Sequence, residues 1–323
     1  MSETLVSRWR AYRDRCRRLG TMIPYRLLKR RRAPISLDLC GRRLTVPMDG
    51  VGTWIWAQWR SCWRTQLIDR ILRQREGVFL DIGTNYGQTL ADFLAVHPDR
   101  RYLGFEPSPA CVAFLDEIIV RNGLSKCQSV CAGLSDTDSM LALHFLPGAF
   151  GDASATLHPE AWGRRQLSHR FIGCYRLDSI WPTVGRERLA LAKIDVEGAE
   201  LEVLSGMRAT MSQQRPPIIC EVLHRNGDAD ADAYRMRVGR LTALVHELDY
   251  AILRIVKKEA ESELLGLEDV AALPTTVWTA ANAHECDYLF VPATEAVAYR
   301  ELVCMGRFAS RVCPAMPNAR DLT

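Results

Sequence analysis

The sequence VFLDIGTNYGQTL, at residues 78–90, decides the fold. Its apolar run, residues 78–82, predicts a buried β-strand. A loop of small residues follows, and a helix is expected from about Gly87. A strand, a glycine-containing loop and a helix in this order form the nucleotide-binding corner of many α/β proteins. A tight strand-to-helix turn without a ligand is the alternative that this segment leaves open.

The spacing of the glycines separates two kinds of nucleotide. Dinucleotide-binding loops carry the pattern G-x-G-x-x-G. This loop instead reads D-x-G-x-N-x-G, formed by Asp81, Gly83, Asn85 and Gly87. Glycine lets the backbone approach a ligand closely, Asp81 can receive a cationic group, and no basic residue is placed to hold phosphates. The loop therefore suits a ligand with an amino acid and an adenosine better than a pyrophosphate.

A second acidic strand end supports this interpretation. The segment RYLGFEPSP, residues 101–109, predicts a short strand that ends in Glu106. Glu106 follows Asp81 by 25 residues. Dinucleotide folds place a carboxylate on the ribose hydroxyls after about 20 residues. With these two acids, the sequence resembles the class I S-adenosylmethionine-dependent methyltransferases.

Three downstream segments make the resemblance more specific. They are RLDSI at residues 176–180, LAKIDVEGAELEVLSG at residues 191–206 and PIICEV at residues 217–222. Their order resembles that of the FkbM-type methyltransferases, and the similarity extends over roughly residues 78–291. The run KIDVEGAE is the most specific part. The usual alanine after the first glycine of the loop is Thr84 here, a mild departure.

The resemblance implies an α/β fold: a Rossmann-like, doubly wound sheet of seven strands with an antiparallel seventh strand, preceded here by an N-terminal helical extension. It also implies S-adenosyl-L-methionine as the cofactor. The expected cofactor-binding residues are Asp81, Gly83, Thr84, Asn85, Gly87, Glu106, Pro107, Ser108, Ser135, Asp136 and Asp195. Asp136 follows the third predicted strand, residues 128–133. An acid there meets the adenine amino group or simply forms a turn.

Four polar residues at the ends of the fourth and fifth predicted strands are the catalytic candidates: Asp195, Glu197, Glu221 and His224. Ligands of open α/β sheets bind at this edge, and an alcohol acceptor needs a base for its proton. Structural roles stay open, with Asp195 as a helix cap, Glu197 near a helix N-terminus and His224 as a surface histidine. Asp195 and Glu221 as Mg²⁺ ligands are a less favoured alternative, and no metal ligand is assigned.

We expect three parts in the chain. Residues 1–76 form a basic extension and a tryptophan-rich lead-in, residues 77–292 the methyltransferase domain, and residues 293–323 a tail. An insertion over about residues 137–176 is expected to cover the acceptor as a lid. Its candidate acceptor contacts are His158, Arg164, Arg165, His169 and Arg170. The four tryptophans Trp54, Trp56, Trp59 and Trp63 form an acceptor pocket or, as we prefer, packing.

Charge is unevenly distributed along the 323 residues. The net charge is +4, and residues 1–32 alone carry +9, which leaves −5 for the rest. A basic amphipathic helix over residues 3–19 suits an anionic membrane, a protein partner or its own domain. No nucleic-acid-binding motif accompanies these charges, so nucleic acid is not expected. Eleven cysteines without a C-x-x-C pair, and no apolar leader, favour a reduced cytoplasmic protein, peripheral to a membrane at most.

The sequence therefore predicts an S-adenosylmethionine-dependent methyltransferase that modifies a hydroxyl of a sugar, glycan or secondary metabolite. Two alternatives are weighed against it. An NAD-dependent sugar-modifying enzyme lacks its G-x-G-x-x-G here. A non-catalytic Rossmann-like module that binds a partner or membrane would have no reason to keep Asp81, Glu106 and Asp195 together. The oligomeric state is not predicted.

Overall fold

The computed structural model describes residues 33–39, 42–49, 51–58, 62–146, 155–159, 167–185, 187–225, 231–258 and 263–304. The helix expected over residues 3–19, the basic segment 1–32, Trp59, Arg164 and Arg165 lie outside these residues. Within them, no helix is both long enough and apolar enough to span a membrane.

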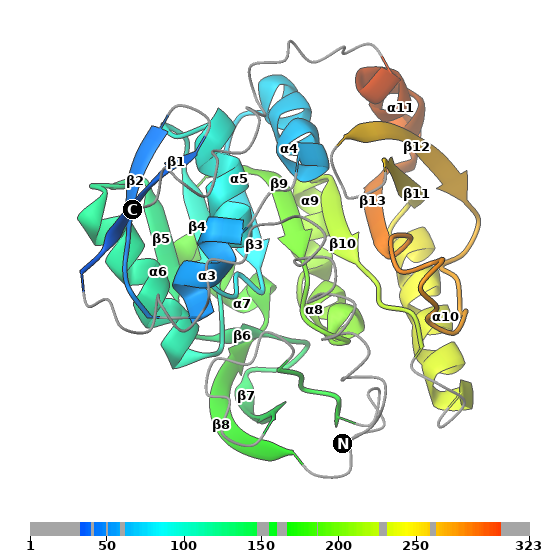
Figure 1. Ribbon diagram of the computed structural model, residues 1–323. Helices are drawn as coiled ribbons and strands as arrows, with labels where there is room; N and C mark the ends of the chain where they lie inside the picture. The colour runs from blue at the N-terminus through cyan, green and yellow to red at the C-terminus, as the bar shows by residue number, and fades with distance from the viewer. Residues whose placement is uncertain are drawn as a thin grey trace.

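A large mixed sheet forms the centre of the molecule (Figure 1). Its strands are β3 (Val78–Ile82), β4 (Tyr102–Phe105), β5 (Cys127–Val130), β9 (Leu189–Ile194), β10 (Ile218–Glu221), β11 (Tyr250–Lys257), β12 (Leu264–Val270) and β13 (Asp287–Pro292). Their spatial order is β12-β11-β13-β10-β9-β3-β4-β5. The five adjacent strands β5, β4, β3, β9 and β10 are parallel to one another. Strand β13 is antiparallel to both β10 and β11.

This order confirms the predicted class I methyltransferase sheet. Strand β3 lies at the centre, with β4 and β5 on one side and β9 and β10 on the other. The antiparallel β13 lies between β10 and β11. The common dinucleotide-binding order is 3-2-1-4-5-6, without an antiparallel strand in that place. The sequence predicted seven strands, and the sheet has an eighth, β12, which pairs with β11 at the edge. Its segment LLGLEDV lacks the apolar run that marks a buried strand, which is why the sequence did not predict it.

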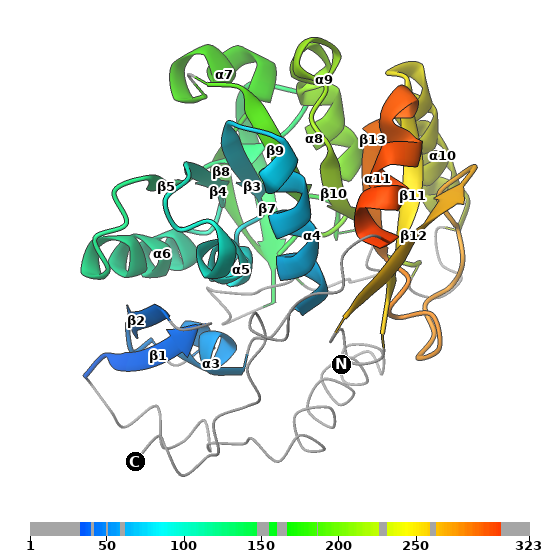
Figure 2. The ribbon, with the colours of Figure 1, turned by 90° about the horizontal axis from the view of Figure 1, so that it is seen from above.

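Helices cover both faces of the sheet (Figure 2). One core packs α3 (Val51–Gln58), α4 (Cys62–Gln74), α5 (Gln88–Val96), α6 (Pro109–Arg121) and α11 (Ala296–Cys304) against it. The opposite core packs α7 (Leu177–Val184), α8 (Glu200–Gly206), α9 (Arg208–Gln214) and α10 (Ala231–Glu247). Alternate residues of one strand divide between the cores: Phe79 joins the first, and Val78 and Leu80 the second. The strand alternation therefore builds a three-layer sandwich.

Two small sheets complete the described part. Strands β1 (Ile35–Leu39) and β2 (Arg42–Val46) form an antiparallel pair beside α3. The insertion between the third and fourth core strands contains β6 (Gly133–Leu134), β7 (Ser139–Phe145) and β8 (Ser168–Tyr175), in the order β6-β8-β7. This insertion lies at the lower end of the central sheet in Figure 1. The extra strand predicted at residues 141–146 is thus β7, paired in register with β8.

Two helices precede β3. Helix α3 begins at Val51 and α4 begins at Cys62. Trp54 and Trp56 lie on α3. Ser108 occupies the N-cap position of α6, but its side chain makes no capping hydrogen bond. The carboxylate of Glu106 takes the backbone N–H of Ser108 instead, at 2.8 Å.

Candidate functional site

The loop after β3 turns sharply at the carboxyl edge of the sheet. Gly83, Asn85 and Gly87 all have positive φ, at 81°, 50° and 89°. A Cβ atom on Gly83 would lie 1.9 Å from the carbonyl oxygen of Asp195, and one on Gly87 would lie 2.4 Å from Leu115. Only glycine fits these two positions, because both the left-handed backbone and the close approach exclude a side chain. The glycine spacing read from the sequence thus reflects a tightly packed loop.

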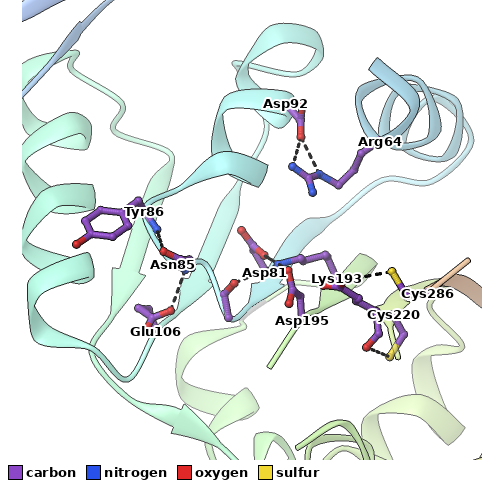
Figure 3. A network of polar contacts seen from close by, with 12 residues as sticks. Arg64, Asp81, Asn85, Tyr86, Asp92, Glu106, Lys193, Asp195, Cys220 and Cys286 are labelled. Carbon is purple, nitrogen blue, oxygen red and sulfur yellow. Dashed lines mark hydrogen bonds and ion pairs between the residues drawn. The ribbon is translucent and has the colours of Figure 1, made fainter. Parts of the chain in front are cut away.

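Glu106 ties the loop to the neighbouring strand (Figure 3). Its Oε2 accepts the backbone N–H of Asn85 at 2.8 Å, and its Oε1 accepts that of Ser108 at 2.8 Å. Burial raises the pKa of Glu106 to about 7. The two backbone amides favour the ionised form and act to lower this pKa, but burial outweighs them. Each carboxylate oxygen can accept two hydrogen bonds, so one position on each remains for a ligand. Pro107 beside it is half-buried.

A buried lysine joins the first and fourth strands of the core. Lys193 Nζ lies 3.4 Å from Asp81 Oδ1 and 3.2 Å from Asp195 Oδ2, and it donates to the Gly83 carbonyl at 3.1 Å. Asp81 is fully buried, and its Oδ2 accepts the Tyr102 hydroxyl at 2.5 Å. Burial acts to lower the pKa of Lys193, but the charges of Asp195 and Asp81 act in the opposite direction and outweigh it. The pKa of Lys193 is therefore raised, and the lysine stays charged. Figure 3 shows the three side chains converging beneath the loop.

Asp81 directs its carboxylate to protein groups, and its role toward the cofactor stays a prediction. Its carboxylate is occupied by Lys193 and Tyr102 inside the protein, while the backbone of the loop faces the crevice. Lys193 and Tyr102 were not predicted from the sequence as functional residues. Lys193 lies on β9 and Asp195 directly follows that strand, two residues later, so both side chains point to the same face. That spacing is the signal that would have identified it.

Asp195 and Glu221 meet at the ends of β9 and β10. Their carboxyl groups hydrogen bond to one another. Burial and the neighbouring Asp195 raise the pKa of Glu221 well above its usual range. Burial also acts to raise the pKa of Asp195, but Lys193 outweighs it and holds that pKa below its ordinary value. The pKa of Glu221 is thus raised and that of Asp195 lowered, and the Asp195 side chain is 32% exposed.

His224 is held by protein groups at both ring nitrogens. Its Nε2 lies 2.9 Å from the carbonyl oxygen of Asn282, which can only accept, so Nε2 carries the proton. Its Nδ1 lies 3.0 Å from the hydroxyl of Thr276 and accepts from it. Because both ring nitrogens are engaged by protein groups, the buried ring has no lone pair ready for an acceptor hydroxyl. Of the catalytic candidates, His224 is the one that the geometry does not favour.

Glu197 lies in a tight turn after β9. Its φ is 56°, and that of Gly198 is 106°. The carbonyl of Glu197 accepts the hydroxyl of Thr156 at 2.7 Å, and Thr156 belongs to the insertion. Two residues further along the insertion, His158 Nε2 lies 3.4 Å from Glu202. The insertion is thus attached to the turn after β9 and to α8, and its role as a lid over the acceptor stays a prediction.

The other predicted contacts have mixed positions. Ser135 is buried and Asp136 is exposed, and the Ser135 hydroxyl donates to Asp136 Oδ1 at 3.3 Å. Thr84 is buried, and its hydroxyl has no hydrogen-bond partner among the described residues. His169 and Arg170 are exposed on β8. The two point to opposite faces of that strand, as neighbouring residues must.

A pocket opens between α8, α10 and the segments that follow β9 and β10. Six of its lining residues are Glu197, Glu200, Leu223, His224, Tyr234 and Arg237. Burial raises the pKa of Glu200 to about 7, although its Oε1 accepts the Gly198 amide at 2.9 Å. Among the residues that the structure describes, no group of three or more His, Cys, Asp or Glu side chains is arranged to hold a metal ion.

Comparison with known proteins places this site in a family. The methyltransferase FkbM domain matches residues 81–252, more than half of the chain. Methyltransferase sdnD of Sordaria araneosa is 31% identical over 153 residues, covering 40% of this chain and 59% of sdnD. The 2-O-methyltransferase NoeI of Sinorhizobium fredii is 28% identical over 158 residues, covering 45% of this chain and 63% of NoeI. The matches thus span less than two thirds of either relative.

Among solved structures, methyltransferase FkbM from Methylobacillus flagellatus KT is similar to this chain, with 17% sequence identity and a TM-score of 0.43. The similarity covers 74% of this chain and 50% of that one. The domain match begins at Asp81 and contains Glu106, Lys193, Asp195 and Glu221. The protein therefore belongs to the methyltransferase FkbM domain family.

Proposed function

We propose that this protein is an S-adenosylmethionine-dependent O-methyltransferase that acts on a hydroxyl of a small molecule or glycan. The observation that carries the proposal is the arrangement of Glu106 and the loop from Gly83 to Gly87 beside the Asp195–Glu221 pair. The family match supports methyl transfer. The relative NoeI, whose name is 2-O-methyltransferase, supports an oxygen acceptor.

The residues present fit the cofactor. Glu106 keeps one acceptor position on each oxygen for the two ribose hydroxyls, because each oxygen already receives one backbone amide. Side chains on Gly83 and Gly87 would collide with Asp195 and Leu115, so the loop keeps its tight turn only with glycine at these positions. Asp136 is exposed and follows β6, beyond the end of the third core strand β5 at Val130, and it is assigned to the adenine amino group. Asn85 and Thr84 complete the loop.

When bound, S-adenosylmethionine supplies the methyl group from its sulfonium, and the sulfur leaves as a neutral thioether. The protein must then orient the acceptor, exclude water and accept one proton. We assign the hydroxyl proton to Asp195, because its side chain is partly exposed and Lys193 favours its charged form. Glu221 donates to Asp195 and so orients its carboxylate. Lys193 stabilises the charged form of Asp195 before the acceptor arrives.

Glu197 and the adjoining pocket are proposed to hold the rest of the acceptor. The pocket contains apolar walls from α8 and α10 and the polar groups of Tyr234 and Arg237. Arg237 is already engaged, since its Nε donates to the Gly198 carbonyl at 3.0 Å and its guanidinium contacts Glu202. The acidic groups around Asp195 suit a neutral hydroxyl better than an anionic acceptor.

The test is methyl transfer by the purified chain. The protein is incubated with S-adenosylmethionine and a panel of sugars, oligosaccharides and polyketide alcohols, and formation of S-adenosylhomocysteine is measured. We expect product with at least one alcohol, and a loss of about 10²–10⁴-fold in turnover for Asp195→Asn, the range for losing a general base. Turnover by Asp195→Asn and Glu221→Gln equal to that of the wild type would refute the assigned base.

A further inference from the structure

Helix α3 packs directly on the cofactor loop. The indole Nε1–H of Trp56 donates to the backbone carbonyl of Tyr86 at 2.6 Å, and Trp56 is 1% exposed. The Trp56 ring also approaches Gly87, where a Cβ atom would lie 3.3 Å from it. Tyr86 lies between Asn85 and Gly87, both with positive φ. A tryptophan from outside the predicted domain thus holds the centre of the loop.

The helix that carries Trp56 is itself fixed to the sandwich. Just before it, Thr45 and Asn122 exchange two hydrogen bonds, at 2.7 and 2.9 Å, which join β2 to the end of α6. Asp49 Oδ1 accepts the Gly52 amide at 2.9 Å at the start of α3. Figure 2 shows β1, β2 and α3 together beneath α5 and α6. The support is therefore rigid on the side away from the loop.

The loop transmits this support to Glu106. Asn85 Oδ1 accepts the Tyr86 amide at 2.8 Å, and the Asn85 amide donates to Glu106 Oε2 at 2.8 Å. The Tyr86 ring contacts Phe114 of α6 edge to face, with ring centroids 5.4 Å apart. Fixing the Tyr86 carbonyl from one side and its ring from the other restrains the residue that directly follows Asn85, and the Asn85 side chain is tied to that residue through the Tyr86 amide.

We propose that Trp56 is a positioning residue for cofactor binding, and that its indole N–H sets the loop so that Asn85 holds the Glu106 carboxylate ready for the ribose. This inference rests on the proposed function. It assigns a role to residues 51–58, which the sequence placed in a lead-in and which the FkbM domain match, residues 81–252, does not include.

Trp63 provides a matched control within the same region. It is also buried, at 2% exposure, but its indole nitrogen has no hydrogen-bond partner among the described residues. Its ring packs under the Lys257 ammonium, 4.8 Å from the ring centroid, and not on the loop. Trp56→Phe and Trp63→Phe therefore remove the same atoms from buried sites, and only the first removes a hydrogen bond to the loop.

The experiment measures S-adenosylhomocysteine binding by calorimetry across pH 5.5–8.5 for wild type, Trp56→Phe and Trp63→Phe. We expect Trp56→Phe to weaken binding about 5–50-fold, the range for an unsatisfied buried carbonyl that is partly coupled to the ligand. Trp63→Phe should bind within about twofold of wild type. Because the Asn85 amide favours ionised Glu106, Trp56→Phe should also move the pH midpoint of binding upward.

The titratable groups that face Glu106 are Asp81, Tyr86, Cys111, Cys131 and Lys193.

Equal affinities and equal pH midpoints for the two phenylalanine variants would overturn the inference. Failure of the wild type to bind S-adenosylhomocysteine would instead overturn the proposed function, so the two failures are distinguishable. If Trp56→Phe does not fold, Gly52→Ala tests the same contact, because a Cβ there would lie 2.6 Å from the Tyr86 ring and push α3 from the loop. The same upward shift of the pH midpoint is expected, and an unshifted midpoint in this variant contradicts the assignment.

Discussion

The ammonium nitrogen of Lys193 lies 3.2 Å from Asp195 Oδ2, two residues further along the same chain segment. The contact joins the inside of the sheet to the open crevice, since Lys193 is 5% exposed and the Asp195 side chain 32%. The same ammonium neutralises the fully buried Asp81. One lysine thus serves both the stability of the sheet edge and the charge state of the proposed base.

Lys193→Met should destabilise the protein by about 3–5 kcal/mol, the cost of leaving a buried charge without its partner. Chemical unfolding at pH 7 measures this. Lys258→Met is the matched control, because Lys258 and Glu263 are both exposed and lie 3.5 Å apart. Its effect should stay within about 0.5 kcal/mol, as for other surface pairs. Equal stabilities of the two variants would show that Asp81 does not depend on Lys193.

Cofactor affinity should depend on the ionisation of Glu106. Burial raises the pKa of Glu106 to about 7 in the free protein. The ribose hydroxyls donate to the carboxylate, so binding favours its charged form and lowers this pKa. S-adenosylhomocysteine binding should therefore be strongest above pH 7, weaken as the pH falls through about 7 and release a proton there. Calorimetry in buffers of different ionisation enthalpy detects that proton.

Replacing Glu106 should remove this pH dependence. Glu106→Gln should weaken binding by about 1–3 kcal/mol, the scale for hydrogen bonds to a charged group. Glu200→Gln is the control, because burial raises the pKa of Glu200 to about 7 as well, but Glu200 lies in the pocket beside α10. A pH dependence of binding that persists in Glu106→Gln and disappears in Glu200→Gln would show that Glu200, and not Glu106, is the titrating group.

Gly83 should tolerate no side chain. Gly83→Ala would place a Cβ 1.9 Å from the Asp195 carbonyl at a φ of 81°. We expect a loss of about 1–3 kcal/mol in stability, the cost of such a backbone conformation, together with a loss of cofactor binding. A Cβ atom on Gly239 of α10 would instead meet no neighbouring side chain within 4 Å in the described part of the chain, so Gly239→Ala should stabilise by about 0.5–1 kcal/mol. Thermal unfolding of both variants compares them, and an unchanged Gly83→Ala would refute the tight loop.

His224 should not be the general base. Both of its ring nitrogens are engaged, by Asn282 and Thr276. His224→Gln should keep turnover within about tenfold of wild type, whereas a lost general base costs about 10²–10⁴-fold. Once an acceptor is known, steady-state kinetics decides between them. A loss of about 10²–10⁴-fold in turnover, with unchanged cofactor affinity, would show that His224 is the general base.

The sequence predicted the core of this fold because its strands are short apolar runs that end in functional residues. Asp81, Glu106, Asp195 and Glu221 all lie where the strand ends required. The charges that these residues carry were not predictable, because they depend on cross-strand neighbours. The raised pKa of Glu221, for instance, follows from burial, from Asp195 at the end of the adjacent strand and from Asp287, which faces it across the antiparallel pair.

The residues that fix His224 illustrate a second limit. Thr276 and Asn282 lie 52 and 58 residues further along the chain, in a segment without a periodic pattern. The support of the loop by Trp56 is similar, since the two residues are 30 apart and belong to no shared motif. Periodicity identifies which face of an element is buried, but it does not give the partner that a polar atom finds on another element.

The most direct test of the proposed cofactor site is calorimetry of the purified wild-type protein at pH 8 with S-adenosylhomocysteine and, separately, with NAD. The loop geometry and Glu106 predict saturable binding of S-adenosylhomocysteine with one site per chain, lost or strongly weakened in Glu106→Gln, and no binding of NAD. Saturable binding of NAD by a protein that does not respond to S-adenosylhomocysteine would contradict the assignment.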